Sequence, residues 1–143
     1  MTIVSSSAVA SPFATYGGTW GGSGRVTLAG GSSEAIRCRA YYSVKSSGRE
    51  LGLAIRCASA SYSIELRSQL KQSGGSVSGS WVERTFNASG NVVGSASASA
   101  LNLTISGGVA GSMSIRVSGR TQSVSIRTST TQLRGVDINL SRS

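Results

Sequence analysis

From Thr19 onward, apolar and polar residues alternate with a period of two along almost the whole chain. This is the pattern of a β-strand that buries one face and exposes the other. No long segment shows the period of roughly 3.6 residues that is typical of a helix. The alternation is clearest where the inward set is Ile36, Cys38, Ala40, Tyr42 and Val44. The chain is therefore expected to be all-β.

Short clusters of Gly, Ser and Asn interrupt the alternation and mark about eight to ten strands. No long crossover connection is visible, so each strand is expected to pair with the next one. This favours an antiparallel up-and-down β-barrel, with a β-sandwich as the alternative. The run "VVGSASASALNLTIS" is too long for one regular strand and changes parity near Ala100, which predicts a bend or bulge there.

The chain has 143 residues, which is the size of one domain. Residues 16–143 are expected to form this domain. Residues 1–15 are expected to be a disordered tail or a signal-peptide remnant, because the tripeptide AVA before Ser11 has the form of a signal-peptidase site. No run approaches the roughly 20 apolar residues that a membrane-spanning helix needs, so no transmembrane segment is expected.

The tetrapeptide AIRC occurs twice and contains both cysteines of the chain. A tight turn centred on Ser47 and Gly48 would place Cys38 directly opposite Cys57 on the apolar face of one hairpin. Opposed residues of antiparallel strands have Cα atoms about 4.5 or 5.5 Å apart, and a disulfide can bridge that distance. In an exported protein this pair is expected to be a disulfide, and the alternative is two buried free thiols.

The chain is strongly basic, with 14 Lys plus Arg against 5 acidic residues and a net charge of +9. Most of the basic residues are Arg, whose planar guanidinium group suits carboxylate, phosphate and sulfate. An anion-binding surface is expected on the outward face of the strands. The alternative is a solvated face that only confers solubility. The candidate residues are Arg37, Arg39, Arg56, Arg67, Arg116 and Arg127.

The sequence contains no histidine, which removes the usual general base near neutral pH and the commonest ligand of transition metals. Two cysteines without further Cys or His do not complete a zinc site. On the expected strands, the five acidic residues form no pair suited to glycoside hydrolysis. The protein is therefore expected not to be an enzyme and to need neither a metal nor a cofactor.

The stretch GGTWGGSGRVTL, with Gly18-x-Trp20 at its start, resembles the opening of the calycin barrels, the lipocalins and avidins. The resemblance implies a calycin-like barrel in which the tryptophan closes one end and a small ligand lies inside. Glu83 has the same parity as Trp81 and would point inward with it, and the alternative is that the strand leaves the core there and Glu83 is solvated. The expected ligand-binding residues are therefore Trp20, Tyr42, Trp81 and Glu83.

Nearly the whole chain resembles a family of small, uncharacterised exported proteins of rhizobia and related α-proteobacteria. The segments that carry this resemblance are SPFA, GTWGGSG, IRCRAYY, IRCAS, GSW and SVSIRT. The resemblance implies a periplasmic or secreted location and a disulfide. It implies no particular activity.

The expected function is binding of a small apolar or amphipathic ligand inside the barrel. The alternative is a solid barrel whose arginine surface binds an anionic polymer, such as a polysaccharide, lipid A phosphates or, with less support, nucleic acid. The small inward residues distinguish these two functions, because they would leave a ligand cavity in a barrel but would let the sheets of a sandwich pack closely. These residues are Gly22, Gly24, Ala40, Gly79, Gly94, Ala96 and Ala98. Nothing in the sequence specifies an oligomeric state.

Overall fold

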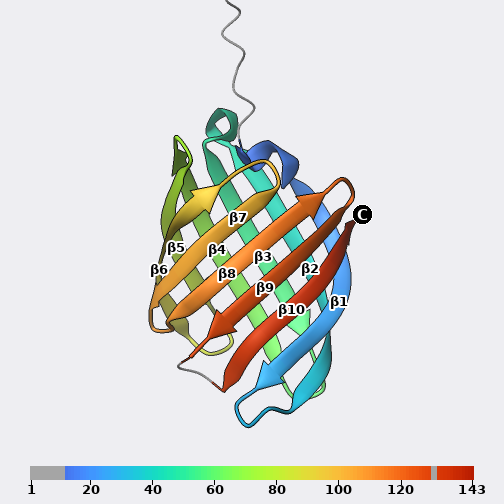
Figure 1. The fold of residues 1–143 in the computed structure, drawn as a ribbon. Helices are drawn as coiled ribbons and strands as arrows, with labels where there is room; N and C mark the ends of the chain where they lie inside the picture. Colours follow the sequence, from blue (N-terminus) through green and yellow to red (C-terminus); the bar gives the residue numbers. More distant parts are fainter. Residues whose placement is uncertain (1–11, 130–131) are drawn as a thin grey trace, which may run out of the picture.

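The computed structural model describes residues 12–129 and 132–143. Ten antiparallel strands form one closed up-and-down β-barrel (Figure 1). Each strand pairs with the next along the chain, and β1 pairs with β10 to close the ring. The predicted antiparallel barrel is confirmed, and the alternative sandwich is excluded. The strands are β1 (Gly18–Leu28), β2 (Ser33–Lys45), β3 (Glu50–Ala58), β4 (Ser63–Ser73), β5 (Ser76–Glu83), β6 (Ala88–Ala96), β7 (Ala100–Gly107), β8 (Gly111–Ser118), β9 (Thr121–Thr128) and β10 (Leu133–Arg142).

Two short 3-10 helices accompany the strands, η1 (Pro12–Thr15) before β1 and η2 (Ser46–Gly48) between β2 and β3. Helix η1 lies at one end of the barrel (Figure 1), and its Phe13 is fully buried. The sequence places the start of the domain at residue 16, whereas packed structure already begins at Pro12. The expectation of a disordered tail or signal remnant over residues 1–11 lies outside the described residues.

The period of two decides which side chains form the core. Along β2, Ile36, Cys38, Ala40 and Tyr42 are buried and the residues between them are not. Val44 belongs to the same face, but it lies near the end of the strand and is 37% exposed. Buried apolar residues from all ten strands merge into one cluster inside the barrel. Because the ring is closed, the described strands leave no sheet edge open to solvent.

The long run around Ala100 contains two strands instead of one bent strand. Strand β6 ends at Ala96, and β7 begins at Ala100 and returns antiparallel to it. The connecting turn is closed by Ser97, whose N–H donates to the Ala100 carbonyl at 2.8 Å. The Ser97 Oγ also accepts a hydrogen bond from the Ala100 N–H at 3.1 Å. The parity change therefore marks a chain reversal, which a serine side chain supports without glycine or proline.

The inward glycines do not create the internal space that the sequence suggests. A Cβ atom added at Gly24 would lie 1.8 Å from the backbone oxygen of Asp137. The same addition at Gly94 would lie 1.8 Å from the backbone oxygen of Asn102. Both glycines therefore allow neighbouring strands to approach closely, which lets the sheet coil and close.

The hairpin formed by β2 and β3 carries the disulfide. Lys45 pairs with Glu50 across the turn, and the same register brings Cys38 opposite Cys57. Their sulfur atoms are 2.06 Å apart and their Cα atoms are 4.1 Å apart. The predicted turn position and the predicted disulfide are both confirmed.

Candidate functional site

The barrel contains a cavity of about 320 Å³ whose wall is almost entirely apolar. Its lining includes Phe86 from the β5–β6 connection, Val109 from the β7–β8 connection and Gln132 just before β10. These connections lie at the end of the barrel remote from η1 (Figure 1). Phe86 is 49% exposed. Small-molecule sites have volumes of roughly 300–1,000 Å³, so this cavity suits a small ligand. Its wall includes Leu53, Leu66, Trp81, Val92, Leu103 and Met113.

The opposite end of the barrel is closed by residues 12–17, which we call the N-terminal cap. The Tyr16 hydroxyl donates to the Ser97 carbonyl at 3.0 Å, and the Thr15 hydroxyl donates to the Ala98 carbonyl at 2.5 Å. These two bonds tie the cap to the turn between β6 and β7. Phe13 and Tyr16 are both fully buried, so the cap contributes side chains to the core as well as covering it.

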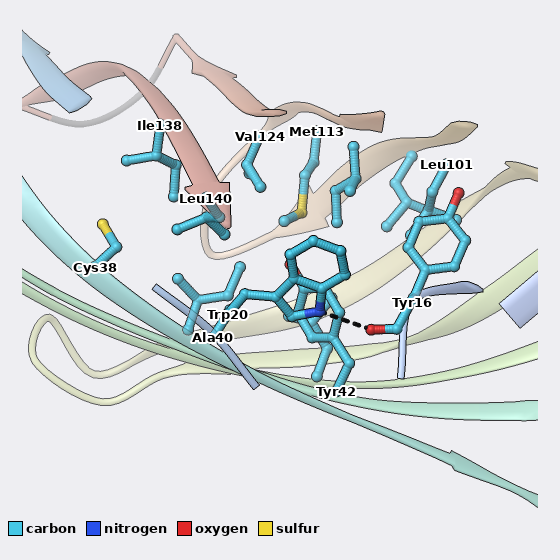
Figure 2. Close-up of a cluster of buried hydrophobic side chains, with 14 of the residues drawn as sticks. Tyr16, Trp20, Cys38, Ala40, Tyr42, Leu101, Met113, Val124, Ile138 and Leu140 are labelled. Atoms are coloured by element: carbon cyan, nitrogen blue, oxygen red, sulfur yellow. Dashed lines mark hydrogen bonds between the residues drawn. The ribbon is translucent and has the colours of Figure 1, made fainter. Parts of the chain in front are cut away.

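Arg142 fastens the other side of the cap to the barrel. Its guanidinium carbon lies 4.2 Å from the centroid of the Trp20 ring. Its two terminal nitrogens donate to the carbonyls of Gly17 and Thr15, each at 2.6 Å. The Trp20 indole N–H donates in turn to the Tyr16 carbonyl at 2.9 Å (Figure 2). Cation–π attraction and three hydrogen bonds therefore hold the cap and Trp20 in one arrangement.

Two of the predicted ligand-binding residues, Trp20 and Tyr42, lie at this capped end and do not line the cavity. Figure 2 shows Trp20 close to Tyr42 in a packed cluster with Leu140, Val124 and Met113. Both aromatic side chains do point inward, as their parity predicts. Parity fails to give their position along the barrel axis, because an inward face runs from one end of a barrel to the other.

The other two predicted residues, Trp81 and Glu83, do line the cavity. The Trp81 indole N–H donates to the Ser106 carbonyl at 3.1 Å, so its polar atom has a partner within the barrel wall. Glu83 is 9% exposed, and among the described residues of the lining it alone is ionisable. Its carboxylate accepts backbone N–H groups from Glu65 at 2.5 Å and from Phe86 at 2.7 Å. These charge-assisted bonds fix a negative group in an apolar wall.

A buried polar pair at the capped end escaped the sequence analysis. The Tyr42 hydroxyl donates to the Gln122 Oε1 at 2.5 Å, and Gln122 Nε2 is buried without a partner among the described residues. Burial raises the pKa of Tyr42 above its ordinary value, and it raises the pKa of Tyr16 to about 12. Both phenols are therefore neutral hydrogen-bond donors at physiological pH. Gln122 has the inward parity of Val124, which is the one sequence signal of its interior position.

The predicted arginine surface divides into two parts. Arg37, Arg39 and Arg56 line a groove of about 860 Å³ with Tyr41 on the outer face of β1–β4. We call this surface the arginine groove. Arg67 is on β4 as well, but it does not line the groove.

The remaining two candidates lie elsewhere, Arg116 on β8 and Arg127 on β9. Arg127 is neutralised by an ion pair with Asp137, in which nitrogen and oxygen are 3.0 Å apart. The structure thus gathers four of the six predicted arginines on neighbouring strands and separates the other two from them.

Within the described ranges, no three His, Cys, Asp or Glu side chains gather in a way that could hold a metal ion. In the same part of the chain, no helix has the length and apolar character needed to cross a membrane. The described residues offer two contrasting surfaces for a ligand, an apolar cavity inside the barrel and a cationic groove outside it.

No family model and no curated protein matches the chain. Its fold is similar to that in the crystal structure of Rv2717c from M. tuberculosis, with a TM-score of 0.72 and 16% sequence identity. The match covers 92% of this chain and 94% of that chain. At this identity the likeness shows that the two proteins share a barrel fold.

Proposed function

We propose that the protein binds a small apolar or amphipathic molecule inside the barrel and does not transform it chemically. The observation that carries the proposal is the 320 Å³ apolar cavity. The other end of the barrel is packed and capped, so the cavity is a defined space within an ordered core. Burying apolar ligand surface gains roughly 25 cal/mol per Å², which favours an apolar guest in such a site.

The polar groups of the wall favour an amphipathic guest over a pure hydrocarbon. Glu83 lies at the end of β5, three residues before the lining residue Phe86. A ligand whose apolar body occupies the cavity would therefore hold its polar end beside the Glu83 carboxylate. Because a carboxylate only accepts hydrogen bonds, we infer that this polar end is a donor, such as an amine or a hydroxyl group.

We also infer that the protein works in the periplasm or outside the cell. The Cys38–Cys57 disulfide supports this location, because disulfides persist in oxidising compartments and are rare in the cytosol. The resemblance to exported proteins points in the same direction.

Two valines on β6 allow a matched test of binding in the cavity. Val92 lines the cavity and is 4% exposed, whereas the adjacent Val93 faces solvent and is 58% exposed. We expect V92F to project a ring into the cavity, and so to weaken strongly the fluorescence increase of N-phenyl-1-naphthylamine, a neutral apolar dye. We expect V93F to bind the dye as the parent protein does. Both variants should first be shown to fold by circular dichroism.

Native mass spectrometry of protein produced in an oxidising periplasm supplies the second readout. An added, dissociable mass on the parent protein and on V93F, but not on V92F, would identify a natural occupant of the cavity. The proposal fails if V92F and the parent protein take up the dye equally. It fails equally if the parent protein takes up neither the dye nor a natural ligand.

A further inference from the structure

The arginine groove concentrates positive charge to a degree that strand pairing normally avoids. Arg39 lies directly opposite Arg56, and Arg37 lies two positions away from Arg39 on β2. Directly opposed side chains have Cβ atoms about 4.5–5.5 Å apart, and like charges at that distance destabilise a sheet. Gly21 lies opposite Arg39 on β1, so the floor of the groove beside this pair has no side chain.

No carboxylate of the described residues forms an ion pair with these three arginines. In the part of the chain that the structure describes, none of them forms an ion pair or a side-chain hydrogen bond. Glu65 lies opposite Arg56 in the register and lines the groove, but it makes no ion pair there. Each guanidinium therefore presents five free N–H donors. A cluster that costs stability and leaves its donors free indicates an anionic partner from outside the chain.

The geometry points to a second binding site, in which the arginine groove holds an acidic polysaccharide on the outside of the barrel. Planar guanidinium groups bind carboxylate and sulfate through paired hydrogen bonds. The groove is open and crosses β1–β4, so an extended chain can lie along it. Tyr41 is 43% exposed at the groove and offers one aromatic face against a sugar ring. This site is independent of ligand binding in the cavity.

Two other polyanions fit the groove less well. Single-stranded nucleic acid is held by aromatic side chains that stack on successive bases. Of the described residues that line the groove, Tyr41 alone is aromatic. A lipid surface is held by apolar side chains that enter the acyl region. The large exposed apolar residues of the described chain are instead scattered over β2, β5, β6 and the β5–β6 loop: Tyr41, Val44, Val82, Phe86 and Val93.

The test measures binding of a fluorescently labelled oligogalacturonate, a carboxylate polymer, by anisotropy at a series of salt concentrations. Neutral dextran, an oligodeoxythymidylate and vesicles with an anionic phospholipid serve as comparison ligands. We expect oligogalacturonate to bind most tightly and binding to weaken steeply as salt rises. R39Q/R56Q should weaken its Kd about tenfold at low salt and reduce the salt dependence.

R116Q/R120Q is the matched control, because it removes the same charge from two exposed arginines outside the groove lining. We expect it to change the Kd by less than about twofold, since screened charges at a distance contribute little. The cavity variant V92F should leave oligogalacturonate binding unchanged.

The inference is overturned if oligogalacturonate does not bind at low salt, or if R116Q/R120Q weakens binding as much as R39Q/R56Q. Tighter binding to the oligodeoxythymidylate or to the vesicles would reject the polysaccharide. Circular dichroism of each variant distinguishes loss of the binding site in a folded protein from loss of binding through unfolding.

Discussion

Glu83 combines two tasks at the scale of a single residue. Its carboxylate accepts the backbone N–H groups of Glu65 and Phe86, so it orders the end of β5 and the loop that follows. The same carboxylate is the one ionisable group that the described residues contribute to the cavity wall. If Glu83 is only structural, the charge of a ligand should not affect its affinity for the cavity. If Glu83 also binds the ligand, the cavity should prefer hydrogen-bond donors and cations.

We expect the parent protein to bind decylamine about tenfold or more tightly than decanoate, because the amine pairs with Glu83 and the acid is repelled. E83Q should remove most of this preference. E83Q should also lower the free energy of unfolding by about 1–2 kcal/mol, because an amide cannot accept both backbone N–H groups in the same way. Dye displacement measures the first effect and urea denaturation the second.

E65Q is the control for net charge, since Glu65 lines the outer groove and not the cavity. It should leave the preference for the amine intact. Equal affinities for amine and acid in the parent protein would reduce Glu83 to its structural role. Loss of all ligand binding in the parent protein would instead reject the cavity proposal itself.

For single residues, the sequence predicts well whether a side chain points into the barrel and predicts poorly where it lies along the barrel axis. The parity of Trp20, Tyr42, Trp81 and Glu83 correctly places all four side chains inside the barrel. It does not separate the capped end from the open end, because that depends on how strands far apart in sequence are staggered around the ring. The missed residue, Gln122, has inward parity too, but a single polar residue in a serine-rich segment is a weak signal.

The β2–β3 hairpin has reactive or charged side chains on both of its faces. Its inner face holds the disulfide, and its outer face holds the opposed Arg39 and Arg56. The register that brings the cysteines together also places the two arginines side by side, since they are neighbours of the cysteines on both strands. The covalent bond thus fixes the register on which the arginine groove depends.

Replacing both cysteines in C38S/C57S should lower the free energy of unfolding by about 3 kcal/mol, because the bond closes a loop over a sequence separation of 19 residues. Urea denaturation of the parent protein with and without a reducing agent gives the same comparison without mutation. Cavity binding should survive in the folded variant, because neither cysteine lines the cavity. A change below about 0.5 kcal/mol would show that the hairpin is held by packing alone.

Strand positions follow from the sequence because each strand buries one face and exposes the other. The break near Ala100 was expected as a bend and is a complete reversal, since Ser97 forms the turn that glycine or proline usually signals. The inward glycines were expected to leave a cavity, yet Gly24 and Gly94 permit close strand contact. Alternation indicates which way a residue points and contains no information about the distance to the next strand.

At the scale of the whole molecule, the barrel is asymmetric along its axis. One end is filled by aromatic side chains and closed by the N-terminal cap, and the other contains the cavity. Arg142 on the last strand stacks on Trp20 of the first strand and binds the carbonyls of the cap. It thereby joins three parts of the molecule that are remote in sequence.

R142A should lower the free energy of unfolding by about 2–3 kcal/mol, because it removes the cation–π contact and two charge-assisted hydrogen bonds. R142K keeps the charge but loses the planar fork, so it should recover only part of the loss. Hydrogen exchange at the Trp20 indole N–H should accelerate in R142A. R134A, on the exposed face of the same strand, is the control and should change neither the free energy of unfolding nor the exchange rate at Trp20. If R142A changes neither of them, burial of Phe13 and Tyr16 holds the cap without Arg142.

The seam between β1 and β10 also sets the order in which the molecule can assemble. Its strand pairing joins residues from the two ends of the domain, such as Trp20 and Arg142. Each hairpin between successive strands closes a short loop, whereas the seam closes the longest loop and so carries the largest chain-entropy cost. Until β10 docks, the nine-stranded sheet has two open edges that invite pairing with other chains.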